Sequence, residues 1–345
     1  MRNVVIALTL AGCATTGDSP GAIGPMTNGM STLAGAPTPG YVDGDRATAR
    51  FADPVNVARG PDGKTYVADF DNSKIRVVDD AGTTTTLIAQ NNFRRPFGIA
   101  FAPDGSLYVS TDNDQNGGHT LMSGTIWKVD VGAKSATVIA NAIGRPRGMT
   151  PMADGRLALT DDLHHVIEIL DPHTGQLVTL AGTWDAAGMA DDQGAAARFS
   201  TPYSVVQRKD GSLVIADFTN NRLRLVGLDG GVSTLAGAGG AGFADGAMAS
   251  AEFSHPQALA IDKADTIYVT DLGNFRIRRV KGDTVDTVAG NGNGGWVDAD
   301  NPLDGELFGL EGMSVTPDGA MLVIADGTRG EEVPHNYIRT VVVAN

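Results

Sequence analysis

Short apolar runs alternate with polar, glycine-rich turns along the whole chain, and the same order of runs recurs six times. In each recurrence a first apolar run is followed, roughly fifteen residues later, by a second that ends in aspartate. The first runs are Pro54-Val-Asn-Val, Pro96-Phe-Gly-Ile, Pro146-Arg-Gly-Met, Pro202-Tyr-Ser-Val, Pro256-Gln-Ala-Leu and Leu310-Glu-Gly-Met. The aspartates are Asp69, Asp161, Asp217, Asp271 and Asp326, with Asp112 one residue later in the second repeat. Alternation over so few residues, with no competing helical period, predicts β-strands.

Turn signals separate the two runs, and two further runs complete each repeat. Asp-Gly dipeptides such as Asp62-Gly63 and Asp210-Gly211 lie between the first and second runs, and this dipeptide between apolar runs is a strong hairpin signal. A third run follows, as in Arg222-Leu-Arg-Leu-Val226, and a fourth, as in Val232-Ser-Thr-Leu-Ala236. Such a unit cannot bury both faces alone, so repetition predicts an all-β, six-bladed β-propeller with four-stranded blades.

The two ends of the repeat region predict how the ring closes. The sixth repeat ends with its third run, Tyr337–Val343, and has no fourth run after it. A matching run lies at the other end, because Met30-Ser-Thr-Leu-Ala-Gly35 is nearly identical to Val232-Ser-Thr-Leu-Ala-Gly237. We therefore predict that the N-terminal strand completes the last blade.

Several of these runs resemble NHL repeats. The resemblance is carried by Asp217-Phe-Thr-Asn-Asn-Arg-Leu-Arg224, Asp271-Leu-Gly-Asn-Phe-Arg-Ile-Arg278 and Ser233-Thr-Leu-Ala-Gly237 with the later Phe243-Ala-Asp-Gly246. It extends over residues 30–345 and is clearest in repeats one, four and five. The resemblance implies a propeller with an exposed binding face, but it implies no particular chemistry.

The N-terminal segment has the features of a secretion signal. Met1-Arg-Asn precedes the apolar run Val4–Leu10, and Leu10-Ala11-Gly12-Cys13 resembles the bacterial lipobox, in which the cysteine is acylated. We expect a lipoprotein signal peptide at 1–12, an acylated Cys13 with a flexible tether over 13–29, and the propeller over 30–345. In that bacterial class, Ala14 in place of Asp directs the protein to the outer membrane. A plain signal peptide with an incidental cysteine is the alternative.

Composition narrows the range of partners. The net charge is −14, and Lys and Arg are not clustered, which argues against nucleic-acid binding. Cys13 is the single cysteine, so no internal disulfide can form. The expected partners are the membrane, through the N-terminal lipid, and an unknown protein or small molecule.

Strand direction places the long connections on one face of the predicted ring. These are Ala36–Asp53, Thr183–Thr201, Ala238–His255 and Asn291–Gly309, whereas Gln90–Arg95 and Asn141–Arg145 are short. Binding residues commonly lie in long loops on a rigid scaffold, and the low wall at blades two and three predicts the side of approach. The residues after the motif prolines should crowd the channel mouth on this face. They are Val55, Phe97, Arg147, Tyr203, Gln257 and Glu311, and the last five are our candidate binding residues.

Two interpretations of the channel mouth follow from these residue types. Blades three and six oppose each other in a six-fold ring, so Arg147 and Glu311 would pair directly, or through water or ligand, and plug the channel. Alternatively, the six residues form a mixed polar and aromatic pocket. In the gluconolactonase-like propellers that the fold resembles, carboxylates and amides at such positions bind a metal. Here Glu311 is the single candidate metal ligand with a carboxylate, and Arg147 would oppose a cation.

We expect structural roles for most of the other polar and aromatic residues that the sequence singles out. Asp69, Asp217 and Asp271, with Asn72, Asn220 and Asn274 three residues later, predict Asx-type turns in which the carboxylate accepts backbone N–H groups. His164-His165 is expected in a turn, and the tryptophans in blade cores or as loop anchors. The carboxylates of the loops are expected to be solvated surface charge, with calcium binding as the alternative. They are Asp43, Asp45, Asp191, Asp192, Asp245, Asp298 and Asp300.

The sequence as a whole predicts a non-catalytic binding or scaffold propeller anchored in a bacterial cell envelope, with no cofactor. The alternative is a metal-dependent hydrolase or lyase of the gluconolactonase-like group. An RNA-binding module, as in animal NHL proteins, fits poorly with the secretion signal and the acidic charge.

Overall fold

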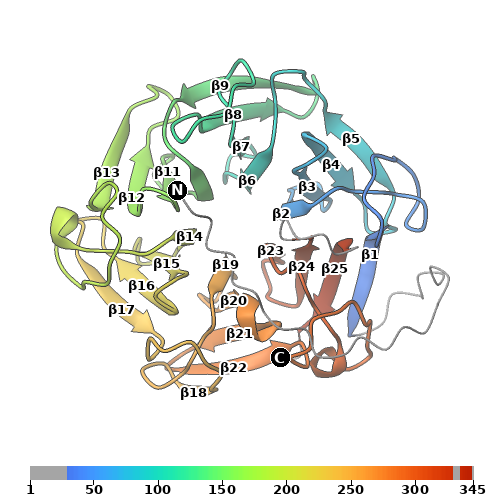
Figure 1. Ribbon diagram of the computed structural model, residues 1–345. Helices are drawn as coiled ribbons and strands as arrows, with labels where there is room; N and C mark the ends of the chain where they lie inside the picture. The colour runs from blue at the N-terminus through green and yellow to red at the C-terminus, as the bar shows by residue number, and fades with distance from the viewer. Residues whose placement is uncertain (1–28, 329–334, 344–345) are drawn as a thin grey trace.

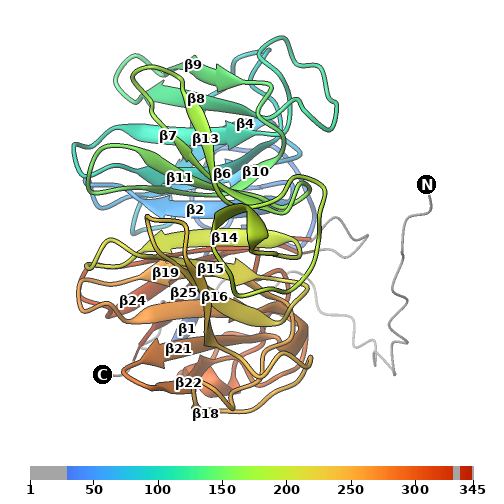
Figure 2. The same cartoon turned by 90° about the vertical axis from the view of Figure 1, so that its left-hand side faces the viewer.

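Six small antiparallel sheets are arranged in a closed ring around a central channel (Figure 1). The computed structural model describes residues 29–328 and 335–343. Blades 1 to 5 follow one another along the chain, each running from the channel outward, and blade 6 combines both ends of the described chain. Seen from the edge, the strands run across the thickness of the ring (Figure 2). The predicted six-bladed propeller of four-stranded blades is confirmed.

The strands take the same four positions in every blade. The innermost are β2 (Pro54–Arg59), β6 (Pro96–Phe101), β10 (Pro146–Pro151), β14 (Pro202–Gln207), β19 (Pro256–Ile261) and β23 (Gly312–Val315). The second are β3 (Thr65–Asp69), β7 (Leu107–Thr111), β11 (Leu157–Asp161), β15 (Leu213–Asp217), β20 (Ile267–Asp271) and β24 (Met321–Asp326). The third are β4 (Lys74–Val78), β8 (Thr125–Asp130), β12 (Val166–Leu170), β16 (Arg222–Val226), β21 (Arg276–Lys281) and β25 (Asn336–Val342). The outermost are β5 (Thr84–Ile88), β9 (Ser135–Asn141), β13 (Leu177–Gly182), β17 (Val232–Ala236), β22 (Thr284–Ala289) and β1 (Met30–Ala36).

Little else in the described chain is regular. The two-residue strand β18 (Gly246–Ala247) pairs with the outer edge of β22. Three single-turn 3-10 helices lie at Gly194–Ala196, Leu272–Asn274 and Pro302–Asp304. Among the described residues there is no helix long and apolar enough to cross a membrane.

The ring closes through its first and last described strands. β1 pairs antiparallel with β25, with Met30 opposite Val341 and Gly35 opposite Tyr337, so blade 6 has the order β1-β25-β24-β23. Figure 1 shows this blade as a blue outer strand beside red inner ones. Every residue of β1 is buried. The predicted pairing of Met30–Gly35 with Tyr337–Val343 is confirmed.

The hydrophobic core lies between neighbouring blades. The second strands of all six blades are almost wholly buried, because each is covered by the blades on both sides, and they read as continuous apolar runs such as Leu213–Asp217. The core clusters accordingly join residues from adjacent blades; one contains both Ile215 of blade 4 and Ile167 of blade 3. This packing holds the inner strands at fixed positions around the channel.

The two faces of the ring differ, as predicted. The Asp-Gly hairpins join first to second strands on one face, and Gly63, Gly105, Gly155 and Gly211 there have φ between 78° and 88°, a region that favours glycine. The four long connections lie on the opposite face, which we call the loop face. The predicted signal peptide at 1–12, Cys13 and most of the tether lie outside the described residues.

Candidate functional site

Four blades share a buried arginine that joins two aspartates. In blade 1, Arg76 Nη1 donates to Asp69 Oδ2 at 2.8 Å, and Arg76 Nη2 donates to Asp43 Oδ1 at 2.6 Å. Arg76 also donates to the carbonyl oxygens of Val42 and Arg50, and its side chain is fully buried. The same arrangement recurs around Arg224, Arg278 and Arg339, with Asp217 and Asp191, Asp271 and Asp245, and Asp326 and Asp298.

The network gives the strand-end aspartates their predicted structural role. Asp69 Oδ1 accepts the backbone N–H of Ala52, and Asp69 Oδ2 accepts an amide hydrogen of Asn72 at 2.9 Å. Asp217 with Asn220 and Asp271 with Asn274 repeat this pattern. The loop carboxylates Asp43, Asp191, Asp245 and Asp298 have a role beyond solvated surface charge, because each neutralises a buried guanidinium.

Blades 2 and 3 depart from this pattern. Trp127 and Glu168 occupy the register position of the buried arginine, opposite Val109 and Leu159. Trp127 is a core residue whose indole N–H donates to Thr111 Oγ1 at 2.9 Å. Both blades are preceded by short connections, so they also lack the long-loop aspartate that would face an arginine. The regular network is therefore limited to the four blades that follow the long connections.

The predicted channel-mouth residues do meet in one place. Val55, Phe97, Arg147, Tyr203, Gln257 and Glu311 all line a cavity of about 340 Å³ at the loop-face end of the channel. They come from six different blades, so the ring geometry brings together residues that are 42 to 56 positions apart from one blade to the next. A volume above about 300 Å³ is in the range of small-molecule sites.

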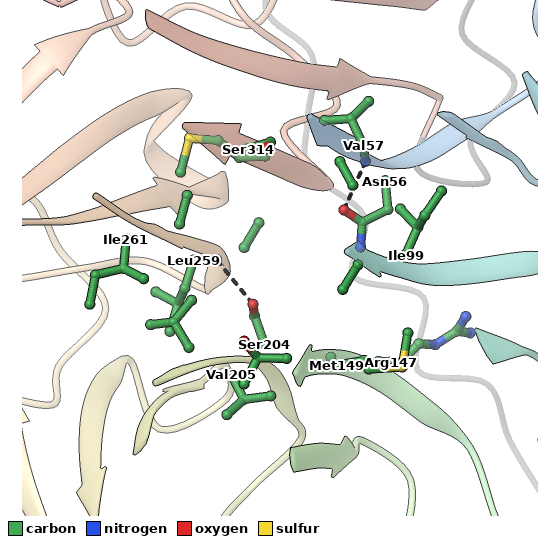
Figure 3. A pocket seen from close by; sticks show the side chains of 18 of the residues that line it. Asn56, Val57, Ile99, Arg147, Met149, Ser204, Val205, Leu259, Ile261 and Ser314 are labelled. Atoms are coloured by element: carbon green, nitrogen blue, oxygen red, sulfur yellow. Dashed lines mark hydrogen bonds between the residues drawn. The ribbon is translucent and has the colours of Figure 1, made fainter. Parts of the chain in front are cut away.

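A second cavity continues the channel toward the hairpin face. It has a volume of about 260 Å³, and its walls are mainly the inner strands, with Val57, Ile99, Val205 and Leu259 among them (Figure 3). Polar groups in this wall are already engaged: Asn56 Oδ1 accepts the N–H of Val57, and Ser204 Oγ accepts that of Leu259. Five residues line both cavities and therefore form the layer between them: Phe97, Arg147, Tyr203, Gln257 and Glu311.

Arg147 pairs with an aspartate of the neighbouring blade. Its Nη1 lies 3.0 Å from Asp112 Oδ1, and its guanidinium carbon lies 3.9 Å from the ring centre of Phe97. Figure 3 shows the side chain extending from β10 away from the middle of the cavity of about 260 Å³. Burial disfavours the charged guanidinium, but Asp112, and to a lesser extent Tyr203, Asp162 and Glu311, hold the pKa of Arg147 above its usual value. The ion-pair partners of Arg147 are thus Asp112 and, at 3.8 Å from its Nε, Asp162, rather than Glu311.

Aromatic rings form a continuous band across this layer. The ring centres of Phe70 and Phe97 are 6.1 Å apart, those of Phe97 and Tyr203 5.8 Å, and those of Tyr203 and Phe218 5.4 Å. Burial raises the pKa of the Tyr203 phenol, and the Arg147 charge only partly opposes this. Tyr203 therefore stays a neutral hydroxyl at ordinary pH.

Gln257 is the least satisfied neutral side chain of the layer. It is 3% exposed, and its Oε1 has no hydrogen-bond donor among the residues that the structure describes. Buried amide oxygens usually have a partner, because losing water without replacement costs about 1–3 kcal/mol. Gln257 lines both cavities, so its unpaired acceptor is at the boundary that a bound molecule would touch.

A second set of mouth residues, those directly before the motif prolines, was not among the candidates predicted from the sequence. Asp53, Arg95 and Arg145 line the cavity of about 340 Å³ at the mouth, although none of them was a candidate binding residue. Asp53 and Arg95 have φ of 49° and 52°, and the pre-proline residues Thr201 and His255 have φ of 57° and 56°. The sequence did contain a signal, because these residues share one aligned position directly before the motif prolines.

The residues of the mouth do not fit a divalent metal. Among the described residues there is no group of three or more His, Cys, Asp or Glu side chains that could hold an ion. Glu311 is the single carboxylate of the shared layer, and the Arg147 charge lies in the same layer. Elsewhere, His164 and His165 point to different partners: His164 Nδ1 lies 2.7 Å from Asp185, whereas His165 Nδ1 accepts the N–H of Thr201.

Comparison with known sequences gives one partial relative. No family model matches the chain. A stretch of 185 residues, 53% of this chain, is 31% identical to the Protein SUPPRESSOR OF QUENCHING 1, chloroplastic, of Arabidopsis thaliana. That stretch covers 15% of the plant protein, so the similarity concerns a small part of it.

Comparison with solved structures confirms the class of fold. A structural genomics protein of unknown function from Bacteroides thetaiotaomicron superposes with a TM-score of 0.73 at 17% identity, covering 92% of this chain and 76% of that one. An auxiliary nutrient binding protein from Bacteroides ovatus gives 0.70 at 17% identity, covering 92% and 77%. A virginiamycin B lyase from Staphylococcus aureus gives 0.51 at 13% identity, covering 84% and 80%. At these identities the similarity shows the fold alone.

Proposed function

We propose that this chain is an NHL-type, non-catalytic binding propeller, anchored in a bacterial cell envelope through acylated Cys13, that binds a small molecule at the channel mouth on its loop face. The proposal extends the sequence prediction, in which the ligand was a protein, a peptide or a small molecule. A cavity of about 340 Å³ favours the small molecule or the end of a peptide over a broad protein contact. The nutrient-binding role named for one structural neighbour is in keeping with this proposal.

The observation that carries the proposal is the layer of side chains between the two cavities. It combines a band of aromatic rings with polar groups whose hydrogen-bonding capacity is unused among the described residues, above all Gln257 Oε1. An apolar surface with a few convergent polar groups is typical of ligand sites. The same layer offers no nucleophile with an adjacent base and no set of metal ligands, so binding without chemistry fits it better than hydrolysis.

A ligand screen tests this function directly. Purified full-length protein in detergent is screened by thermal shift against sugars, amino acids, dipeptides, nucleosides and organic acids. A ligand that binds only the folded state raises the melting temperature according to its concentration and affinity. We expect at least one class to do so, and Gln257→Leu to reduce the shift.

The choice of variant keeps this result interpretable. Gln257→Leu replaces an unpaired buried amide by an apolar group of similar size, which leaves stability unchanged or raises it. Gln176→Leu, placed before the outermost strand of blade 3, is the matched control and should keep the full ligand shift. A screen without any shift that depends on Gln257 would contradict the proposed function.

A further inference from the structure

We infer that the ligand of the channel mouth is an organic carboxylate with an apolar body, whose carboxylate is bound by Arg95 and Arg145 beside Arg147. This inference rests on the proposed function and names its ligand class. The three arginines line the same cavity of about 340 Å³ and come from blades 2 and 3. Arg95 and Arg145 each directly precede a motif proline, which places both at the rim of the mouth.

The hydrogen bonding of these arginines differs from that of the structural arginines. Arg76, Arg224 and Arg278 each donate to two carboxylates and two carbonyl oxygens within their own blades. By contrast, the side chains of Arg95, Arg145 and Arg147 donate no hydrogen bond to any residue that the structure describes. Arg147 Nε, Arg147 Nη1 and Arg145 Nε are buried and still lack an acceptor there.

The ion pairs around this cluster do not use up its donors. Arg145 lies 3.7 Å from Asp112 and 3.9 Å from Asp162. Arg147 lies 3.0 Å from Asp112 without hydrogen-bond geometry and 3.8 Å from Asp162. Arg95 has no carboxylate within 4.0 Å in the described chain; it stacks over Phe70 at 4.8 Å, with Asp71 further away. Each guanidinium has five N–H donors in a planar fork that matches a carboxylate. The cluster thus has unused donors of the kind that bind a carboxylate.

Arg95 and Arg145 lie at the rim of the mouth, each at the end of a short connection that follows β5 and β9 respectively. The predicted low wall is not found at blade 2, because the connection between β7 and β8, residues 112–124, also lies on the loop face. In a chain with a net charge of −14, arginines concentrated at the entrance attract an anion locally that the rest of the surface repels.

The aromatic band and two carboxylates of the cavity define the rest of the ligand. Phe97 and Tyr203 lie next to Arg147, and Phe218 continues the band, so a flat or aliphatic body can pack there once the carboxylate is held. Asp53 of blade 1 and Glu311 of blade 6 line the same cavity. These carboxylates disfavour a second negative group, which limits the ligand to one carboxylate at the arginines.

Calorimetric titration with acid and amide pairs tests the inference. The full-length protein is titrated with 3-phenylpropionate, indole-3-acetate and hexanoate, and with the carboxamide of each, which has the same shape without the charge. We expect at least one acid to bind about tenfold or more tightly than its amide, the usual effect of charged hydrogen bonds. Arg95→Met and Arg145→Met should each weaken the acid by about tenfold and leave the amide unchanged.

Arg94→Met is the matched control, because Arg94 is the exposed neighbour of Arg95 and its Nε donates to the carbonyl of Asn91 instead. Overturning results are equal binding of acid and amide, Arg95 and Arg145 variants that behave like Arg94→Met, binding of no acid in the panel, or inorganic phosphate that binds as tightly as the best acid. If neutral ligands give a shift that depends on Gln257 while these acids fail, the proposed function stands and this inference falls.

Discussion

Glu168 occupies in blade 3 the register position that Arg224 occupies in blade 4. Each is the central residue of a third strand, opposite Leu159 and Ile215 respectively. Arg224 lies between two aspartates, whereas Glu168 lies near Asp161, and its Oε2 has no partner among the described residues. Burial, reinforced by the charge of Asp161, raises the pKa of Glu168 to about 8. One blade therefore contains a neutral carboxylic acid where its neighbour contains a paired cation.

The first prediction concerns the pH dependence of stability. In the unfolded chain Glu168 ionises near 4.5, but in the folded chain it does so near 8. The folded state binds this proton more tightly, so its stabilising effect is complete below about pH 4.5 and is lost as the pH rises through about 8. The loss amounts to the order of a few kcal/mol. Urea unfolding at pH 5.5 and pH 8.5 should show it, and Glu168→Gln should remove most of the difference.

The Glu168→Gln variant also shows which result would contradict this prediction. Glu168→Gln keeps the size of the side chain and removes the titration, while every other group still titrates. If wild type and Glu168→Gln lose stability in parallel between the two pH values, Glu168 does not carry the dependence.

The second prediction concerns the arginine network. Removing one partner of a buried ion pair leaves the other charge unpaired, which costs about 3–5 kcal/mol. Arg224→Met should therefore lower the free energy of unfolding by that amount, since Asp217 is fully buried. Arg222→Met in the same strand is the control; Arg222 donates to one exposed carbonyl, and its loss should cost about 0.5 kcal/mol. Guanidinium chloride unfolding measures both, and equal effects would contradict the role of the network.

The propeller could be predicted from the sequence because its determinants are local and repeated. Alternation, Asp-Gly turns and the match of Met30–Gly35 with Val232–Gly237 each require only neighbouring residues. The partners of Asp43, Asp191, Asp245 and Asp298 were not recognised, because the two aspartates of a network lie 26 positions apart in blades 1, 4 and 5. The regular interval of seven residues from Asp69 to Arg76, Asp217 to Arg224 and Asp271 to Arg278 was present as a signal.

The position of the candidate site could be predicted from the sequence, but its residues and their ion pairs could be predicted only in part. A six-fold ring places the residues after the motif prolines around the channel, and they do line one cavity. The partner of Arg147 was not predictable from ring symmetry, because Asp112 lies one residue beyond β7, and Thr111 takes the register position that an aspartate has in blades 1, 3, 4 and 5. Arg95 and Arg145 were missed because residues directly before the motif prolines look like loop ends in the sequence, whereas the ring brings both to the lining of this cavity.

The third prediction concerns ring closure. Without β1, strand β25 would present an unpaired edge, and the buried side chains Met30 and Leu33 would be lost from two core clusters. Deleting residues 14–36 should lower the melting temperature by many degrees. Leu33→Ala keeps the strand and its backbone pairing, so it should give a smaller decrease, equivalent to about 2–5 kcal/mol. An unchanged melting curve for the deletion would refute closure by this strand.

The fourth prediction concerns the anchor. If Cys13 is acylated, Cys13→Ser should leave the melting temperature of the propeller unchanged and release the protein from the membrane fraction. Stable anchoring requires more than one acyl chain, and lipoprotein modification supplies them. Fractionation of cells, with the protein detected in each fraction, measures this. A Ser variant that stays with the membranes would show that the lipobox assignment is wrong or that another contact holds the protein there.

The last prediction concerns catalysis. A divalent cation such as calcium requires six or more oxygen ligands at about 2.3–2.6 Å. In the layer between the cavities, Glu311 offers a carboxylate and Gln257 an amide oxygen, while Arg147 adds a positive charge that an ion would have to overcome. We therefore expect no turnover above background when the protein is incubated with a panel of lactones and calcium, zinc or manganese. Metal-dependent turnover that Glu311→Gln abolishes, with the fold intact by circular dichroism, would replace the binding function by a hydrolase. Turnover that survives this substitution would instead indicate a contaminating enzyme or a site away from the channel mouth.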